Sequence, residues 1–549
     1  MGLLAATGAS LAMAQIGGRL APTAAGQRIS VNDYGARGDG NSDDTAAIKA
    51  ASEALVSGGT LVFPKGEYLI SQACAGHQTK YGRKVMFLSG KTDIVIVGEG
   101  ATIKCRNHAI ASHGGLVFLW VESSQRITVE GLAFDMTFVG CNKSAAAYPF
   151  CGAIIISDGA PTGARTERQL SSHITVRNCS FKLYNPLGSY VTTNNPHNGD
   201  PNNGYKLYSI FAGGDHLATL PANQNNDIRV ESCTWKRGHN GYGAWVWAFN
   251  TVRFERLVAE SWVTKNSDTS GAVKGGGVPF VRYHQWHCSD VWVTKCNFVA
   301  KPCNERMQSG LEGEGTFCHL TTNLKGNYRH GRAIVRENKV ALGNGDGANK
   351  IGDYGVLITI FGDVVISENV FEGEPSAVNA LGGSCVLYAA ESFGGDGAGT
   401  LTVSKNTFGA GGRYNQNIVI ANGSTISAEK RRCKSITVRE NISHAQLRNF
   451  LDLTANSTAP HVGCSDVLIE NNTVIGAKNP IVSSSDIKSV VLRLAASASG
   501  DRIVVRGNTV RDRHTFADVS RVNTGATAVF DNNKLEAVAV DLAGRPASR

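Results

Sequence analysis

The sequence is poor in charge and lacks several patterns that mark common classes of protein. Only 18% of its 549 residues are charged and 42% are hydrophobic, a balance that excludes intrinsic disorder and provides a large core. No stretch approaches the run of about 18 apolar residues that a transmembrane helix needs, so no membrane span is expected. The 13 cysteines contain no CxxC pair, which leaves a zinc ribbon unsupported, and neither a cofactor nor a metal is predicted.

Long runs of lysine and arginine are also missing. The net charge of +9 favours an acidic partner, such as a uronic-acid polysaccharide, nucleic acid or an anionic membrane. The positive residues are scattered, however, and the densest cluster is EKRRCK at 429–434. Because no zinc-finger or RNP pattern accompanies it, nucleic acid is disfavoured as a partner.

One nine-residue pattern recurs along most of the chain. It reads x, aliphatic, x, aliphatic, x, x, Asn or Cys, x, and then usually Phe, Val or Trp. The alternating aliphatic residues predict a strand with one buried face, and the fixed Asn or Cys predicts a turn into a second strand. The clearest copies are HITVRNCSF (173–181), DIRVESCTW (227–235), DVWVTKCNF (290–298), RAIVRENKV (332–340), DVVISENVF (363–371), TLTVSKNTF (400–408), SITVRENIS (435–443), DVLIENNTV (466–474) and RIVVRGNTV (502–510).

A single register repeated over this length predicts an all-β solenoid, a parallel β-helix, rather than a series of ordinary domains. Equivalent positions in successive coils would lie about 4.8 Å apart. Asn side chains at the fixed position can then hydrogen-bond up the stack, and Cys can fill the same position as a small apolar residue. We expect these core residues to be Cys179, Cys233, Cys296, Asn338, Asn369, Asn406, Asn441, Asn472 and Asn508.

The segment SDDTAAIKAASEALVSGG, residues 42–59, predicts a helix that caps the open end of this stack. Ser42 or Asp43 is the expected N-cap, and the Gly58–Gly59 pair is expected to end the helix. Its apolar stripe consists of Ala47, Ile48, Ala51 and Leu55.

Together with the strand-like TLVFPKGEYLI that follows, the segment from VNDYGARGDGNSDD onward closely resembles the N-terminal signature of the pectate-lyase-like superfamily. That group contains polygalacturonases, other polysaccharide hydrolases and lyases, and phage tail-spike depolymerases. The resemblance implies a single-stranded right-handed parallel β-helix with an N-terminal capping helix. It also implies that the acids of this segment are architectural rather than catalytic, namely Asp33, Asp39, Asp43 and Asp44.

The catalytic pattern of the polygalacturonases is not present in this sequence. NSD at 266–268 and GHN at 238–240 are fragments of it in the wrong order, and no Arg-Ile-Lys follows them. The calcium cluster of pectate lyases is not identifiable either. The catalytic roles of those enzymes are therefore not carried over to this chain.

The expected organisation is a β-helix domain over 29–549, with a cap at 31–59, coils at about 60–535 and a tail at 536–549. Residues 1–28 are signal-like, since MGLLAATGASLAMAQ ends in a cleavage-like Ala-Met-Ala, although they lack the basic start of a secretory signal. They also resemble the lead-in of some phage tail spikes. We expect a secreted or extracellular protein, with a phage virion tail as the alternative, and the tail-spike resemblance implies a homotrimer.

In this superfamily, sugar chains are bound in a groove along one β-face, and two stretches carry candidate substrate-binding residues. RGHNGYGAWVWAFN (237–250) supplies His239, Tyr242 and Trp247. Aromatic rings there would stack on sugar rings. Trp245 shares a strand face with Trp247, and whether that face is core or binding surface stays open.

VRYHQWHCSD (281–290) alternates Arg282, His284 and Trp286 on one face with polar residues on the other. Because neither face is purely apolar, this stretch predicts a groove or a subunit contact. Arg282 suits a carboxylate, and His284 suits a base. His284 and His287 would lie on opposite faces of a strand, which disfavours a metal site.

The candidate catalytic acids flank these stretches. Hydrolysis of a glycosidic bond needs a protonated acid and a second carboxylate, about 5–9.5 Å apart depending on the stereochemistry. Glu312 and Glu314 share a face if their segment is extended, although the Gly-rich flanks equally suggest a surface loop. The full candidate set is Asp268, Glu312, Glu314, Asp346 and Asp353.

The leading functional prediction is a depolymerase that cuts an extracellular or capsular, acidic polysaccharide. Hydrolysis by two carboxylates and elimination by a Tyr, His, Lys or Arg base both remain open. The alternative is a non-catalytic carbohydrate-binding adhesin or structural tail-spike module, because a fold does not by itself imply a function.

Overall fold

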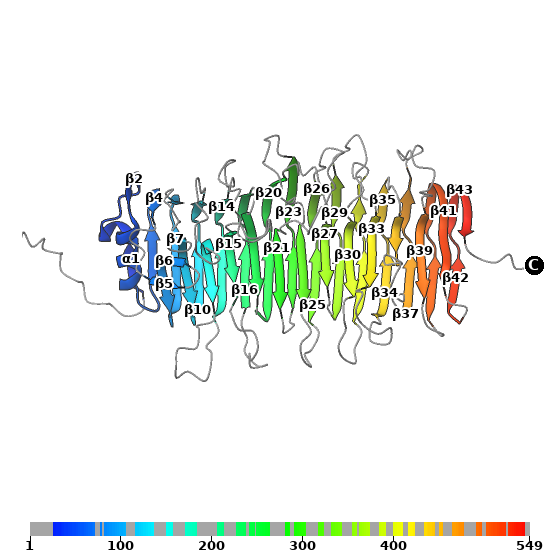
Figure 1. The fold of residues 1–549 in the computed structure, drawn as a ribbon, viewed down its shortest axis with the longest axis horizontal. Helices are drawn as coiled ribbons and strands as arrows, with labels where there is room; N and C mark the ends of the chain where they lie inside the picture. The colour runs from blue at the N-terminus through cyan, green and yellow to red at the C-terminus, as the bar shows by residue number, and fades with distance from the viewer. Residues whose placement is uncertain are drawn as a thin grey trace, which may run out of the picture.

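The described residues form a long stack of mostly parallel strands with an α-helix at the N-terminal end (Figure 1). The computed structural model describes residues 26–71, 77–79, 82–105, 116–136, 150–157, 171–183, 206–213, 227–237, 241–247, 249–263, 280–285, 290–302, 317–322, 331–342, 354–359, 362–373, 384–390, 399–409, 416–422, 433–444, 449–453, 464–476, 490–496, 501–522 and 525–543. The predicted β-helix is confirmed. No helix among these residues is long and apolar enough to cross a membrane.

The strands fall into three runs, which we call sheets 1, 2 and 3; sheets 2 and 3 join at β41. Sheet 1 contains β1 (Arg28–Ser30), β3 (Thr60–Phe63), β7 (Thr92–Gly98), β10 (Gln125–Glu130), β13 (Ser172–Arg177), β16 (Asp227–Glu231), β19 (Thr251–Glu255), β22 (Val291–Thr294), β25 (Arg332–Arg336), β28 (Asp363–Ser367), β31 (Thr400–Ser404), β34 (Cys433–Arg439), β37 (Cys464–Glu470), β40 (Arg502–Arg506) and β42 (Thr527–Asp531).

Sheet 2 contains β2 (Asp39–Asp43), β4 (Gly66–Ile70), β8 (Ala101–Cys105), β11 (Ala133–Asp135), β14 (Ser180–Leu183), β17 (Thr234–Arg237), β20 (Val258–Val263), β23 (Asn297–Pro302), β26 (Lys339–Leu342), β29 (Val370–Gly373), β32 (Thr407–Phe408), β35 (Ile442–His444), β38 (Thr473–Ile475), β41 (Thr509–Val522) and β43 (Lys534–Ala543). Sheet 3 contains β5 (His77–Thr79), β6 (Gly82–Ser89), β9 (Leu116–Glu122), β12 (Phe150–Ser157), β15 (Lys206–Ala212), β18 (Gly241–Trp247), β21 (Val281–Gln285), β24 (Cys318–Thr322), β27 (Tyr354–Thr359), β30 (Ser384–Ala390), β33 (Gln416–Asn422), β36 (Asn449–Asp452) and β39 (Val490–Ala496).

The nine-residue pattern is the turn from sheet 1 into sheet 2. A residue with positive φ, such as Glu337 at 58° or Glu368 at 57°, ends the sheet 1 strand and precedes the fixed Asn or Cys. The left-handed conformation redirects the chain within a single residue, at a cost of roughly 1–2 kcal/mol for a residue with a Cβ. Its recurrence at the same position in coil after coil explains why the pattern keeps one register.

The fixed position forms the predicted ladder inside the stack. The side-chain amide of Asn369 donates to Oδ1 of Asn406 at 2.9 Å, and Asn406 donates to Asn441 at 3.0 Å. Equivalent bonds join the remaining neighbours from Asn338 to Asn533. The ladder prediction is confirmed.

The cysteines continue this column, as expected. The backbone amide of Cys179 donates to Sγ of Cys233 at 3.4 Å, and that of Cys296 donates to Oδ1 of Asn338 at 2.9 Å. Leu257 fills the same position in the coil between Cys233 and Cys296. Burial raises the pKa of the Cys296 thiol to about 12, which fits a packing residue rather than a reactive one.

Aromatic rings stack beside this column in the core. Phe134 and Phe181 lie parallel with ring centroids 5.2 Å apart, and Phe181 stacks on Trp235 at 5.0 Å. Farther along, Phe371 and Phe408 repeat the arrangement at 5.3 Å. These residues occupy the last position of the nine-residue pattern, so the sequence repeat becomes a continuous apolar stack.

The capping helix α1 (Thr45–Ala54) covers the N-terminal end, with Ile48, Ala51 and Leu55 fully buried. Its predicted ends were wrong. The N-cap is Asp44, not Ser42 or Asp43, and the helix ends at Ala54, ahead of the Gly58–Gly59 pair. It ends early because the backbone at Leu55 is already extended (φ −71°, ψ 124°) where the chain turns into sheet 1.

The four aspartates of the cap are architectural, as the resemblance implied. Asp44 is 2% exposed and accepts the backbone amides of Arg37 and Gly38 at 2.7 and 3.2 Å. The backbone amides of Ser42 and Asn41 lower the pKa of Asp39 to about 2. Asp33 completes a capping box at the short 3-10 helix η1 (Val31–Tyr34), and Asp43 binds the Thr45 amide at 3.0 Å.

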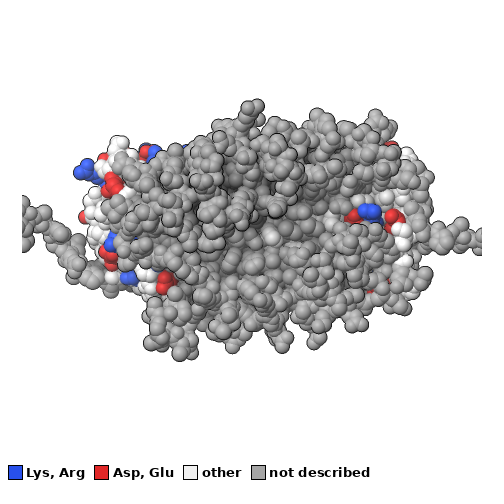
Figure 2. All heavy atoms as spheres, viewed as in Figure 1, with Lys and Arg blue, Asp and Glu red and all other residues white. Residues whose placement is uncertain are grey.

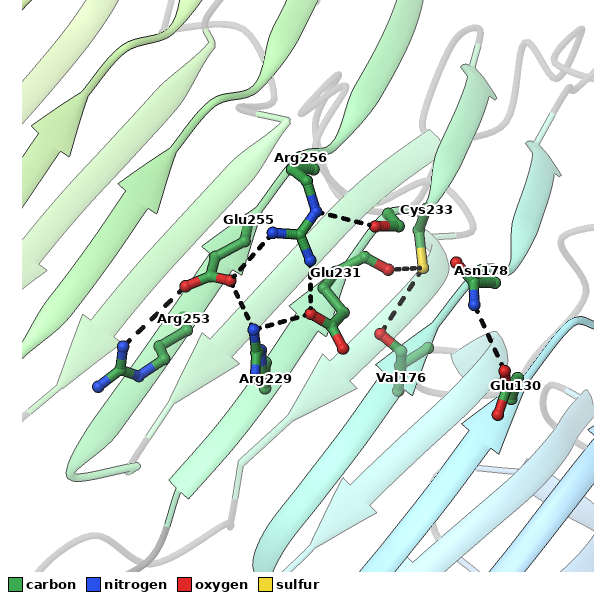
Figure 3. Close-up of polar contacts among 10 residues, drawn as sticks. Glu130, Val176, Asn178, Arg229, Glu231, Cys233, Arg253, Glu255 and Arg256 are labelled. Carbon is green, nitrogen blue, oxygen red and sulfur yellow. Dashed lines mark hydrogen bonds and ion pairs between the residues drawn. The ribbon is translucent and has the colours of Figure 1, made fainter.

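The outer surface of sheet 1 is covered by interlocked ion pairs (Figure 3). Arg229 contacts Glu231 at 2.9 Å and Glu255 at 2.8 Å, while Arg256 contacts Glu231 at 2.8 Å. On the face shown in Figure 2, acidic and basic side chains of the described residues likewise lie next to each other rather than in areas of one sign. The positive charge of the chain is therefore locally balanced on these surfaces.

Candidate functional site

The outer side of sheet 3 carries a second apolar cluster, separate from the main core. Alternate residues such as Leu119, Ile154 and Ile210 point into the main core. The residues between them form what we call the outer aromatic cluster, which comprises Phe87, Val117, Trp120, Ile155, Tyr208, Phe211 and Trp245. The cluster follows the stack axis, because the register pairs Phe87 with Trp120, Trp120 with Ile155, Ile155 with Phe211, and Phe211 with Trp245.

The rings of this cluster are held by one another and by one polar anchor. Tyr208 lies 5.1 Å from Phe211 and 5.4 Å from Trp245, measured between ring centroids. The indole nitrogen of Trp120 donates to Oγ of Ser157 at 2.9 Å. Phe87 and Phe211 are only partly buried. The result is a packed row of side chains in which Phe87 and Phe211 are the partly exposed rings.

A lysine is buried at the N-terminal end of the cluster. The ammonium of Lys84 lies 3.9 Å from the ring centre of Phe87 and 4.0 Å from that of Trp120. Among the described residues, its ion-pair partner is Glu122, at 3.8 Å. Burial lowers the pKa of Lys84 to about 8, although Glu122 acts in the opposite direction.

The backbone register brings four predicted substrate-binding positions beside this cluster. Tyr242 pairs with Tyr208, and Arg282 pairs with both Trp245 and His319. Trp247 pairs with His284 in the next column along the same strands. The side chains of Tyr242, Trp247, Arg282 and His284 lie outside the described parts, as do residues His239 and Trp286 altogether.

The structure answers the open question about Trp245. Its side chain is 6% exposed and belongs to the outer aromatic cluster rather than to the main core. Sequence reasoning missed Trp120, Tyr208, Phe211 and His319, all on sheet 3. The available signal was weak, since LVFLWVE at β9 is buried on both faces and shows no alternation.

The five candidate catalytic acids lie outside the described residues. They are Asp268, Glu312, Glu314, Asp346 and Asp353.

The described part of sheet 3 contains few other titratable groups on its outer side. Asp452, 1% exposed, pairs with Arg493 at 3.4 Å near the C-terminal end. Across the described residues, no group of three or more His, Cys, Asp or Glu side chains is arranged to hold a metal ion.

Residues 28–257 match the family model described as rhamnogalacturonase A/epimerase, pectate lyase-like. Over these residues the match confirms the predicted resemblance to the pectate-lyase-like superfamily, and the described strands form a parallel β-helix. The chain is 45% identical over 74 residues to mannuronan C5-epimerase AlgE3 of Azotobacter vinelandii, covering 13% of this chain and 4% of that protein. It is 41% identical over 73 residues to alginate lyase 7 of the same organism, covering 13% and 8%. It therefore spans less than a tenth of the length of these curated relatives.

Three solved structures of β-helix proteins align with the chain at low identity. The A-module of mannuronan C-5 epimerase AlgE6 of Azotobacter vinelandii aligns over 94% of this chain and 100% of its own, with 11% identity and a TM-score of 0.34. The tailspike protein of E. coli bacteriophage HK620, in complex with a pentasaccharide, aligns over 94% and 80%, with 12% identity and a TM-score of 0.44. PfbA, a surface adhesin of Streptococcus pneumoniae, aligns over 95% and 96%, with 14% identity and a TM-score of 0.39.

Proposed function

We propose that the protein binds an acidic polysaccharide along the outer side of sheet 3 and cleaves its glycosidic bonds. The observation that carries this proposal is the outer aromatic cluster, whose row of rings continues in register into Tyr242 and Arg282. The partly exposed rings of the cluster, Phe87 and Phe211, suit the apolar faces of sugar rings, while an arginine suits a carboxylate.

The substrate class we infer is a polymer of uronic acids. The net charge of +9 supports an acidic ligand. The names of two curated relatives, a mannuronan C5-epimerase and an alginate lyase, point to the same class of polymer. Lys84 lies over two rings of the cluster, and Arg282 pairs in register with Trp245.

Two reactions fit the residues at this face. In elimination, a base such as His284 takes the C5 proton, the C4–O bond breaks as a C4–C5 double bond forms, and the leaving oxygen gains a proton. Arg282 would neutralise the carboxylate attached to C5 and so stabilise the developing charge. In hydrolysis, one of the five candidate acids protonates the leaving oxygen as the C1–O bond breaks. A second carboxylate either activates the water that attacks C1 or attacks C1 itself, and water then hydrolyses the glycosyl-enzyme intermediate.

A panel of acidic polysaccharides distinguishes these reactions. Loss of viscosity with new absorbance near about 235 nm identifies elimination, because the product contains a conjugated double bond. Loss of viscosity without absorbance identifies hydrolysis. If neither occurs while the polymer still binds, cleavage is rejected in favour of a carbohydrate-binding adhesin or tail-spike module.

Arg282→Ala tests the assigned role of the arginine. We expect kcat/KM on the responsive polymer to fall by about 100-fold, in line with the loss of one charge-stabilising group. Arg502→Ala is the matched control, because Arg502 lies on sheet 1 with its side chain 65% exposed and should leave turnover unchanged. Equal turnover in both variants would remove Arg282 from the mechanism.

We further propose that the protein works outside the cell, or on a phage virion tail, as a homotrimer. A polymeric substrate of this kind is extracellular or capsular, which supports the location. Light scattering of the purified chain tests the assembly, and a monomeric mass would reject the trimer.

A further inference from the structure

The outer side of sheet 2 carries a groove that the proposed function does not use. It crosses β14, β17, β20 and β23 and has a volume of about 410 Å³. Pockets for small ligands typically range from about 300 to 1,000 Å³, so a single sugar unit or a short oligosaccharide is a suitable occupant.

Two columns of side chains shape this groove. One column consists of short side chains that follow one another in register along the stack, namely Ser180, Thr234 and Val258. The neighbouring column consists of longer, charged side chains that form a polar wall, namely Lys182, Lys236 and Glu260. Val258 is 47% exposed, so the groove combines an apolar floor with hydroxyls on one side.

The charges in the groove are sparse and unequally paired. Lys182 is held by Asp135 at 3.0 Å. Lys236 is exposed, and no ion pair joins it to another described residue. Glu260 lies next to Lys236 in register. A densely charged polyanion would meet Glu260 and Asp135, whereas a ligand with one carboxylate per ring and several hydroxyls matches one available ammonium and two hydroxyl side chains.

We propose that this groove is an auxiliary binding site for a uronic-acid unit, on a different sheet from the candidate active site. The carboxylate would pair with Lys236, the ring hydroxyls would bond Ser180 and Thr234, and the apolar ring face would pack on Val258. The choice of uronic acid rests on the proposed function; the groove itself does not. A polymer held on two sheets of one molecule binds with an increased effective concentration at each site.

Lys236→Glu tests the proposal, with Lys434→Glu as the control. Lys434 is also exposed but lies on β34 of sheet 1, so both variants change the net charge equally. Binding of a hexameric oligomannuronate and a hexameric oligogalacturonate would be titrated by calorimetry, with a neutral hexasaccharide for comparison. We expect the wild-type chain to bind at least one oligouronate at two sites, and Lys236→Glu to weaken one of them at least tenfold.

The outcomes separate this site from the proposed function. If one oligouronate-binding site is lost in Lys236→Glu but kept in Lys434→Glu, the result supports binding in the groove. It does so even if the protein cleaves no polymer. Cleavage that persists in Lys236→Glu, with only binding to the long polymer weakened, also supports an auxiliary role. Equal binding by the two variants, or no binding of either oligouronate to the wild-type chain, would overturn it.

Discussion

At the scale of single residues, the ladder asparagines make the most specific contacts in the core. The amide of Asn406 donates to the Ile366 carbonyl at 2.9 Å and to Asn441 at 3.0 Å. Its Oδ1 accepts both the side-chain and backbone amides of Asn369, at 2.9 and 3.0 Å. Each ladder residue therefore satisfies buried groups in the coils on either side of it.

Asn406→Ala should leave several of these buried groups without partners, each worth roughly 1–3 kcal/mol. We expect a loss of about 3–5 kcal/mol in the free energy of unfolding, measured by urea denaturation followed by tryptophan fluorescence. Asn406→Cys should lose less, because Cys fills this position at Cys233 and Cys296. Asn297→Ala, an exposed control on β23, should change little, and equal losses in Asn406→Ala and Asn297→Ala would contradict the ladder's role.

Lys84 gives stability a dependence on pH with a definite sign. Its pKa is about 8 in the folded chain and 10.5 in the reference state, so between these values the unfolded chain binds more protons. The contribution of Lys84 to the free energy of unfolding therefore rises as pH increases from about 8 to 10.5. Buried thiols such as Cys296 have the opposite effect. The Cys296 thiol ionises at a lower pH in the unfolded chain than in the folded chain, so its contribution to the free energy of unfolding falls as pH rises above about 9.

The contribution of Lys84 is isolated by comparing the wild-type chain with Lys84→Met. As pH rises from 8 to 10.5, the urea midpoint of the wild-type chain should increase relative to that of Lys84→Met. Urea midpoints at several pH values provide the measurement. A difference that stays constant over this window would mean that Lys84 is not desolvated.

The ladder residues could be predicted individually, whereas the aromatic residues of sheet 3 could not. Asn369 and Asn406 stand at a fixed offset from alternating aliphatic residues, because one left-handed residue sets the turn in every coil. Trp120 and Phe211 have no fixed offset from that turn, since connections of varied length precede their strands. Arg282 and Tyr242 were predicted from their residue types alone, and only the backbone register relates them to the row of rings.

At the scale of elements, the ion pairs of sheet 1 link neighbouring strands. Glu231 and Glu255 have side chains only 12% and 16% exposed, and each contacts more than one arginine. Arg253 adds a stacking contact 4.3 Å above the ring centre of Trp292 on the next strand. Networks of this kind contribute more than isolated surface pairs.

Glu231→Gln should remove one of the two carboxylates that Arg229 and Arg256 share, leaving Glu255 as the other. We expect the free energy of unfolding to fall by about 1–2 kcal/mol. The loss should be larger at 20 mM than at 500 mM NaCl, because salt screens the repulsion between the two arginines. Thermal unfolding at the two salt concentrations is the measurement. Glu368→Gln, at a pair whose carboxylate is 40% exposed, should cost less than about 0.5 kcal/mol, and equal effects would contradict the network.

The strands themselves were predictable to different degrees. Sheet 1 strands alternate buried and exposed residues, as in the pattern of β25, and so are visible in the sequence. Sheet 3 strands such as β9 are apolar on both sides, because their outer face is also covered. A continuous apolar run does not reveal which side faces the core, and for this reason the question about Trp245 needed the structure.

At the scale of the whole molecule, the capping helix closes the N-terminal end of the apolar stack. Ile48 is fully buried between the helix and the first coils. Without an apolar contact there, the end of the stack would present open strand edges and core residues to other molecules.

Ile48→Asp should therefore promote association of molecules through their N-terminal ends. We expect a larger mass by light scattering, rising with protein concentration, together with a lower thermal midpoint. Lys49→Asp, on the neighbouring and partly exposed helix position, is the control and should keep the wild-type mass. An unchanged mass for Ile48→Asp would show that the helix is dispensable for closure.

The parallel register of sheet 3 allows whole coils to be gained or lost. Each coil presents one further position in the outer row, and its strand pairs only with the coils before and after it. Duplicating or removing a coil would lengthen or shorten the outer row by one step while leaving every other pairing intact. Under the proposed function, the span of polymer engaged would then follow the number of coils, independently of the chemistry at any one of them.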